Sequence, residues 1–194
     1  MNYKIFDDKI IVPVKCGTRY CEKIFPTYDD SSNGTIYRYG KFRSKPYWHV
    51  YREPISHLIS ALHTELLSVW NGVEDMSVEA LLDRFTRDGG TTHWTRDVCK
   101  KLHNFWSYNR HIVNLVELSQ LTSTLETLGY ATIDYNETDY DFKHYKNWYS
   151  KEECVDLIQR KYPQHWELLY SCALEDTVYY EKLNNRERLS IKLF

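Results

Sequence analysis

Three short stretches of the chain are dominated by apolar and aromatic residues. They read "KIIVPV" at 9–14, "YWHVY" at 47–51 and "HIVNLVEL" at 111–118. The first is apolar on both faces, as the buried strands of parallel sheets are. The second is rich in the aromatic and β-branched residues that favour strands. The pattern therefore predicts three buried strands.

Helical periodicity separates these strands. It is clearest after Pro54, where apolar residues recur at steps of three and four along one face: Ile55, Leu58, Ile59, Leu62, Leu66 and Val69. Ser150 and Glu153 have the spacing of a capping box, and Ser77 and Thr95 can cap two further helices. We expect helices at 18–25, 54–69, 77–85, 95–106, 119–128, 150–162 and 164–183.

The remaining segments are expected to connect these elements. The stretch "TYDDSSNGT" at 27–35 has turn-forming residues and is expected to be exposed. Further strands could lie around 35–43 and 130–135. Strands that alternate with helices predict an α/β fold, in which a small parallel β-sheet is flanked by helices and the C-terminal half is rich in helix. With 194 residues, the chain is expected to form one domain, 1–194.

Composition narrows the choice of partners. The net charge of −2 argues against a general nucleic-acid-binding protein. Five cysteines, an odd number without zinc-site spacing, favour reduced thiols in a cytosolic protein. The N-terminus has no apolar signal-peptide core, and no apolar stretch approaches membrane-spanning length. We therefore expect a complete, cytoplasmic protein without membrane association.

The segment after the first strand has the residues of an anion-binding loop. In "VKCGTRY" a strand leads into a glycine and then a helix, so that backbone N–H groups converge at one point. Lys15 and Arg19 add positive charge, Thr18 adds a hydroxyl, and Gly17 allows a positive φ. A tight turn with two solvated cations is the alternative. The loop is not a Walker A motif, because its lysine precedes the glycine and no GK[ST] sequence occurs in the chain.

A second group that could bind an anion follows the second strand. In "YREPISHLIS", Arg52 lies at the carboxyl end of the strand and Ser60 lies two turns into the next helix. Ligands collect at this edge of a parallel sheet, and an arginine there can grip a phosphate with two hydrogen bonds. The alternative is that Arg52 pairs with Glu53 or with a C-terminal carboxylate, and that Ser60 is an ordinary polar residue on a helix.

These two motifs together resemble those of the sulfotransferases that use 3′-phosphoadenosine 5′-phosphosulfate (PAPS). The first resembles the family's 5′-phosphosulfate loop, with Val14 in place of the usual Pro and Arg19 in place of a second Ser/Thr. Arg52 and Ser60 match its 3′-phosphate motif in type and spacing. "GGTTHWTRDVC" at 89–99 and "YSKEECVDLIQRKY" at 149–162 resemble segments of the carbohydrate-type members. The resemblance covers most of the chain and implies a P-loop NTPase-like sulfotransferase fold.

The resemblance also implies a role for each motif. Lys15 would act at the bridging oxygen of the leaving group, and Arg52 and Ser60 would bind the 3′-phosphate. The residues implied around the 5′ end of the donor are Lys15, Cys16, Gly17, Thr18, Arg19 and Tyr20. For Cys16 itself, a small space-filling role is the alternative. PAPS would be the donor, no metal would be needed, and the acceptor would be a hydroxyl of a carbohydrate or small molecule.

The sequence leaves the general base open. His93 in "TTHW" is one candidate, because imidazole titrates near neutrality, and a structural histidine beside Trp94 is the alternative. The other candidates for the base are Glu22, Asp29 and Asp30. His57 and His63 are expected to be packing or surface residues. Three aromatic residues could stack on a base or sugar but are expected in the core: Trp94, Trp106 and Tyr108.

Two other functions remain open. One is a non-catalytic binding protein that keeps the nucleotide pocket and acts through a partner. The other is a phosphoryl-transfer enzyme on the same scaffold, which the missing GK[ST] disfavours.

Overall fold

The computed structural model describes residues 3–31, 46–87, 93–110, 113–134 and 145–191. Its central sheet has the order β3 (Tyr28–Ser31), β1 (Tyr3–Phe6), β2 (Ile10–Pro13), β4 (Tyr47–Tyr51) and β5 (Val113–Glu117). Strands β2, β4 and β5 are parallel, and β1 is antiparallel to both β2 and β3. The predicted α/β class and the three predicted strands are confirmed.

The antiparallel edge of the sheet was not expected from the sequence. The stretch 27–35, expected to be turns, contains strand β3, and β1 was missed altogether. Both strands have only four residues, and each carries charged side chains, so that neither stands out as an apolar run. A turn at Asp7 and Asp8, both with positive φ, joins β1 to β2 as a hairpin. Residues 130–134 form no strand, and 35–43 lie outside the described residues.

The described residues include seven α-helices and one short 3-10 helix. Their bounds are α1 Thr18–Ile24, α2 Pro54–Trp70, α3 Val78–Arg87, α4 Val98–Tyr108, η3 Leu118–Gln120, α5 Leu121–Thr127, α6 Lys151–Lys161 and α7 Pro163–Ile191. The capping box of Ser150 and Glu153 is confirmed at the start of α6. None of the helices in the described parts of the chain has the length and apolar character needed to cross a bilayer.

The expected start of a helix at Thr95 is wrong. Helix α4 begins at Val98, because Asp97 adopts a positive φ of 58° and its side chain makes no capping hydrogen bond. The cap comes instead from α7, where the buried Asp176 carboxylate accepts hydrogen bonds from the N–H groups of Cys99 and Lys100. A cap supplied from so far along the chain leaves no local signal.

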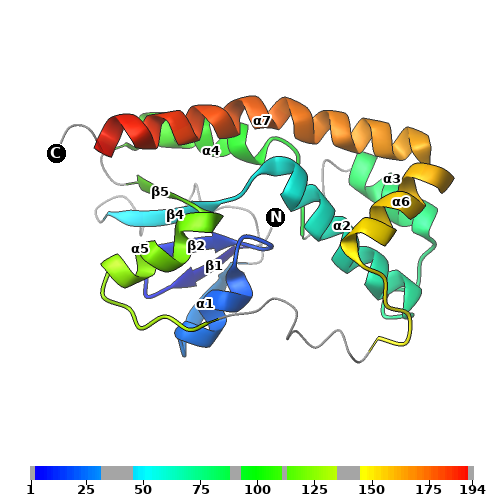
Figure 1. The fold of residues 1–194 in the computed structure, drawn as a ribbon, viewed down its shortest axis with the longest axis horizontal. Coiled ribbons are helices and arrows are strands. Elements are labelled where there is room, and N and C mark those ends of the chain that lie inside the picture. Colours follow the sequence, from blue (N-terminus) through cyan, green and yellow to red (C-terminus); the bar gives the residue numbers. More distant parts are fainter. Residues whose placement is uncertain (1–2, 32–45, 88–92, 111–112, 135–144, 192–194) are drawn as a thin grey trace.

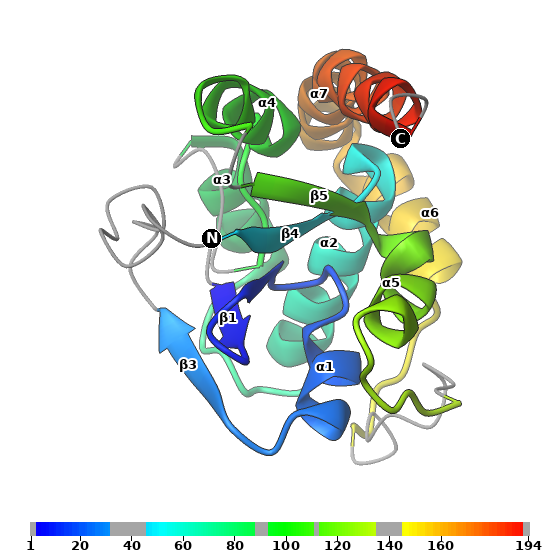
Figure 2. The same ribbon diagram turned by 90° about the vertical axis from the view of Figure 1, so that its left-hand side faces the viewer.

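The helices form two layers on the sheet and a separate bundle beside it (Figures 1 and 2). Alternate residues of β2 point to opposite layers: Ile10 and Val12 pack with α1 and α5, while Ile11 packs with α4. Beyond the sheet, α2, α3, α6 and the first half of α7 share a helical core. Helix α7 spans both parts, since its Leu183 packs with Tyr51 and α4.

Candidate functional site

A cavity of about 800 Å³ lies where the parallel strands end and the helical bundle begins. Segments that follow β2, β4 and β5 form one side of it, and α2, His93 and the start of α6 form the other. This is the edge of a parallel sheet at which ligands bind, and the volume is within the range of small-molecule sites. The residues predicted for the site that line it are Lys15, Gly17, Thr18, Arg19, Tyr20, Arg52, Ser60 and His93.

We call the part of the first side that follows β2 and β4 the strand-end wall; it consists of Lys15, Gly17, Thr18, Arg19 and Arg52. Its loop starts with a turn in which the N–H of Cys16 donates to the carbonyl of Pro13 at 2.9 Å. Lys15 occupies this turn with a φ of 67°, which is unusual for a residue with a side chain. A lysine held in the left-handed region costs about 1 kcal/mol or more, and such strain is concentrated at functional sites.

Gly17 is required in this loop for two reasons. Its φ is 91°, and a Cβ atom would lie 2.8 Å from Leu121 Cδ2 and 3.0 Å from Leu118 Cδ1. The loop therefore packs directly against the segment that follows β5. This contact positions the start of α1, where Thr18 and Arg19 line the cavity.

The structure brings Lys15 and Arg52 together. The Arg52 guanidinium donates from Nη1 to the Lys15 carbonyl at 2.9 Å, so that the end of β4 supports the strained turn. The Lys15 ammonium donates to Thr64 Oγ1 at 2.6 Å, across the cavity on α2. The alternative pairing of Arg52 with Glu53 is not seen, because the Glu53 carboxylate caps α2 by accepting from the N–H groups of Ile55 and Ser56.

Cys16 does not share the position of its neighbours. Its side chain is 1% exposed and belongs to the core between the sheet and α1. Burial raises the pKa of its thiol to about 12, which keeps it protonated at neutral pH. The space-filling alternative describes this residue, whereas Tyr20, on the same helix as Thr18, lines the cavity.

His93 faces the cavity with a buried carboxylate behind it. Its Nδ1 lies 2.6 Å from Oε1 of Glu65, whose side chain is 5% exposed. When the carboxylate accepts from Nδ1–H, the lone pair of the neutral ring is on Nε2. This pair of a solvent-accessible imidazole and a buried orienting carboxylate can transfer a proton.

The other candidate bases are in different surroundings. Glu22 lines the cavity but forms an ion pair with Lys4. Asp29 and Asp30 lie in β3, which β1 separates from β2. Of the candidate bases, His93 therefore has the best geometry.

The histidines of α2 have distinct positions. His57 is buried beneath the strand-end wall, where its Nε2 lies 3.1 Å from the Val14 carbonyl. Burial, with the nearby Arg52 and Lys15 charges, lowers its pKa to about 4, so it is neutral in the folded protein. His63 lines the cavity, although the sequence indicated only a packing or surface role.

The aromatic residues considered for stacking lie elsewhere. Trp94 is buried against Phe85, and Trp106 donates from Nε1 to the Val113 carbonyl under the sheet. Tyr108 is 86% exposed at the end of α4. None of these three lines the cavity.

Several residues that line the cavity were missed in the sequence. They are Lys4, His63, Thr64, Leu118, Leu121, Thr122, Ile133, Asp134, Trp148, Ser150, Lys151 and Glu152. Thr64 could have been found, because it lies one helical turn after Ser60. Glu65 carried a signal as well, since this carboxylate lies three residues after Leu62 and four before Val69 on the apolar face. Trp148 had none, because its place depends on contacts with α2.

Within the described residues, no group of three or more His, Cys, Asp or Glu side chains is arranged to hold a metal ion.

Comparison with models of known protein families, with curated proteins and with solved structures finds no match.

Proposed function

We propose that the protein is a sulfotransferase that transfers a sulfuryl group from PAPS to a hydroxyl of a carbohydrate or small-molecule acceptor. One observation carries the proposal: the residues that resemble the two PAPS motifs, more than thirty positions apart, line one cavity together with an oriented histidine. The two motifs meet because β2 and β4 are adjacent and parallel, and His93 reaches the same cavity from outside the sheet.

The strand-end wall supplies the cations for the donor. Arg52 has five N–H donors, and only the one on the Lys15 carbonyl is engaged by a residue that the structure describes. The guanidinium can therefore bind a phosphate without losing its contact to the loop. Ser60 lies on α2 and also lines the cavity. Its hydroxyl can donate a further hydrogen bond to the same 3′-phosphate. Thr18 and Arg19 would hold the 5′ end.

The transfer needs a base and a cation in the same place. The acceptor oxygen forms a bond to sulfur as the bond from sulfur to the bridging oxygen breaks, and the leaving group is 3′,5′-diphosphoadenosine. His93 Nε2 takes the proton of the acceptor hydroxyl, and Glu65 stabilises the imidazolium that forms. Lys15 neutralises the charge that develops on the bridging oxygen, from a position fixed by Thr64.

Binding of three nucleotides tests the donor. We expect 3′,5′-diphosphoadenosine to raise the melting temperature of the protein more than ADP or AMP does. Arg52→Lys should lower the affinity for 3′,5′-diphosphoadenosine, measured by calorimetry, at least tenfold, because a lysine cannot make the bidentate contact. The same variant should change the affinity for AMP less than threefold. Arg160→Lys on α6, outside the cavity, is the matched control.

Each rival function has its own result in this experiment. Equal losses for both nucleotides would mean that Arg52 does not read a 3′-phosphate. Stabilisation by ATP with Mg²⁺ would favour phosphoryl transfer. Binding of the diphosphonucleoside without transfer of radiolabelled sulfate to any hydroxyl acceptor would select the non-catalytic binding protein.

A further inference from the structure

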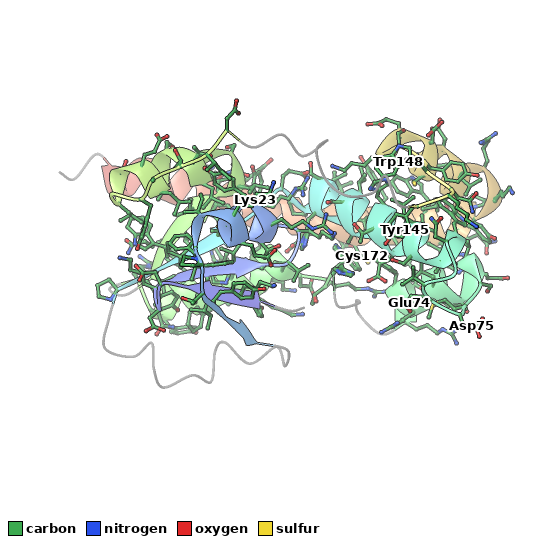
Figure 3. The ribbon with its side chains drawn as sticks, turned by 90° about the horizontal axis from the view of Figure 1, so that it is seen from below. Lys23, Glu74, Asp75, Tyr145, Trp148 and Cys172 are labelled. Carbon is green, nitrogen blue, oxygen red and sulfur yellow. The ribbon has the colours of Figure 1, made fainter. Side chains whose placement is uncertain are left out.

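An exposed tryptophan stands at the helical side of the cavity. Trp148 lies just before α6 (Figure 3). It lines the cavity, and the residue is 51% exposed to solvent. A large ring left this open loses the free energy that burial would give it, about 2 kcal/mol. A bound ligand that covers the ring would recover that free energy.

The backbone on either side of Trp148 is held firmly. Asn71, at the end of α2, accepts from the N–H of Asn147 at 3.0 Å and donates to the Asn147 carbonyl at 3.0 Å. The Asn147 amide in turn donates to the Trp70 carbonyl at 2.9 Å. Three hydrogen bonds therefore fix the segment to α2 one residue before the exposed ring.

Two rings fix the other side. Tyr149 packs on Trp70, with 4.6 Å between the ring centroids. His63 donates from Nε2 to the Tyr149 carbonyl at 2.8 Å, and its ring stands perpendicular to Trp148 at 5.5 Å. The indole is thus presented to the cavity in a fixed orientation, which lowers the entropic cost of stacking a ligand on it.

Polar groups of both signs surround the ring. Ser150, Lys151 and Glu152 also line the cavity. Hydrogen bonds from the start of α6 and from Ser150 lower the pKa of the Glu152 carboxyl, which is therefore ionised at neutral pH. An ammonium donor and a carboxylate acceptor beside an aromatic face suit a neutral ring with several hydroxyl groups, which both donate and accept.

The order of residues along α2 separates Trp148 from the proposed donor grips. Ser60 comes first, next to the end that Arg52 occupies. His63, Thr64 and Glu65 follow, and these contact Trp148, Lys15 and His93 respectively. Trp148 is therefore beside the residues proposed to act on the transferred group. Leu118 and Leu121 line the cavity beside Gly17 and offer an apolar surface that an adenine ring could contact.

We propose that Trp148 is the stacking platform of an acceptor subsite that binds a pyranose ring, with Ser150, Lys151 and Glu152 as its hydrogen-bonding rim. The weakly positive C–H face of a sugar ring complements the negative face of the indole. As a statement about an acceptor, this inference rests on the proposed function; as a statement about sugar binding, it is tested without any transfer.

The test measures sugar binding directly. Saturation-transfer NMR is recorded with methyl β-D-glucopyranoside, methyl β-D-galactopyranoside and phenol, each with 3′,5′-diphosphoadenosine in the sample. The wild type should bind at least one glycoside more tightly than phenol. Trp148→Ala should weaken that glycoside at least tenfold, and Trp148→Phe should keep it within about threefold. Tyr108→Ala removes an exposed aromatic ring outside the cavity and should change nothing.

Calorimetry with 3′,5′-diphosphoadenosine on the same variants keeps the two proposals apart. Unchanged nucleotide binding in Trp148→Ala, with the glycoside lost, supports the sugar platform. A second result also supports the sugar platform: the protein binds the glycoside through Trp148 but does not bind the nucleotide. In that case the proposed sulfotransferase function is wrong. The proposal of a sugar platform is wrong if neither glycoside binds, or if phenol binds more tightly than both. It is also wrong if Trp148→Ala binds the glycoside as tightly as the wild type, or if this variant loses as much affinity for the nucleotide as for the sugar.

Discussion

The two sides of the cavity are built in different ways. The strand-end wall comes from one loop and the residue after β4, and it is held by a strained lysine, a glycine with no room for a side chain and one arginine hydrogen bond. The opposite side, which we call the α2–α6 wall, consists of Ser60, His63, Thr64, Trp148 and the three residues 150–152. Its residues come from α2, from the segment before α6 and from the start of α6, and its side chains are positioned by contacts between distant segments.

This difference separates what each wall can do. The strand-end wall places the cationic side chains of Lys15, Arg19 and Arg52 at the cavity, as an anion site requires. Cys16 and His57 are buried behind it. The α2–α6 wall offers hydroxyl, imidazole and indole groups together with one ammonium and one carboxylate, which suit an uncharged partner with several hydroxyl groups. The two meet at the hydrogen bond from Lys15 to Thr64, next to the Glu65–His93 pair. A reaction between an anionic donor and a hydroxyl acceptor would occur at this junction.

Lys15→Gly should give the largest effect, because it removes the charge and relieves the strain together. We expect sulfuryl transfer to fall about 10³-fold, as for loss of one group that stabilises a transition state. The folded protein should nevertheless be more stable than Lys15→Ala by about 1 kcal/mol, since glycine accepts the φ of 67° without cost. Initial rates and urea unfolding measure the two quantities.

Lys15→Ala is the matched control, because both variants lose the hydrogen bond to Thr64. Equal stability of the two variants would show that the left-handed backbone costs nothing here. Turnover at the wild-type rate in either would remove Lys15 from the chemistry and leave the strand-end wall as a structural loop.

Replacement of His93 should give the next largest effect. His93→Asn is expected to lower kcat about 10²-fold and to remove the acidic limb of the pH–rate profile, because no base then replaces the imidazole. Glu65→Gln should cost about tenfold, since an amide still accepts from Nδ1 but does not stabilise the imidazolium. His165→Asn is the control, because this histidine also pairs with a carboxylate, Asp83, but lies outside the cavity. A wild-type pH profile in His93→Asn would point to another base.

The same division explains which parts could be predicted from the sequence. The parallel strands and the strand-end wall are local patterns, in which a few neighbouring residues carry both the fold and the chemistry. Arg52 and Ser60 were found because both belong to one short motif, at the end of a strand and in the helix that follows it. The partners Glu65 and His93, or His63 and Trp148, are joined only by the tertiary fold. The short strands β1 and β3 were missed because their pairing, rather than their composition, makes them strands.

His57 connects the two walls and should make the protein sensitive to acid. It lies on α2, and its ring contacts the Val14 carbonyl at the start of the strand-end loop. The unfolded chain binds a proton there near pH 6.5, whereas the folded protein does so only near pH 4. The unfolded state therefore holds more protons in this window, and the free energy of unfolding falls as the pH falls from 6.5 to 4. Between pH 7.5 and 5.0, His57 alone should lower the free energy of unfolding by about 2 kcal/mol.

His49 is a second buried histidine and shows whether the effect follows from burial in general. Its pKa is also lowered to about 4 by burial, but it lies in β4 against Tyr3, away from the cavity. Urea unfolding at the two pH values should show about 2 kcal/mol less pH dependence in either His57→Gln or His49→Gln than in the wild type. An unchanged pH dependence in His57→Gln would mean that the pKa of this ring is not lowered in the folded protein.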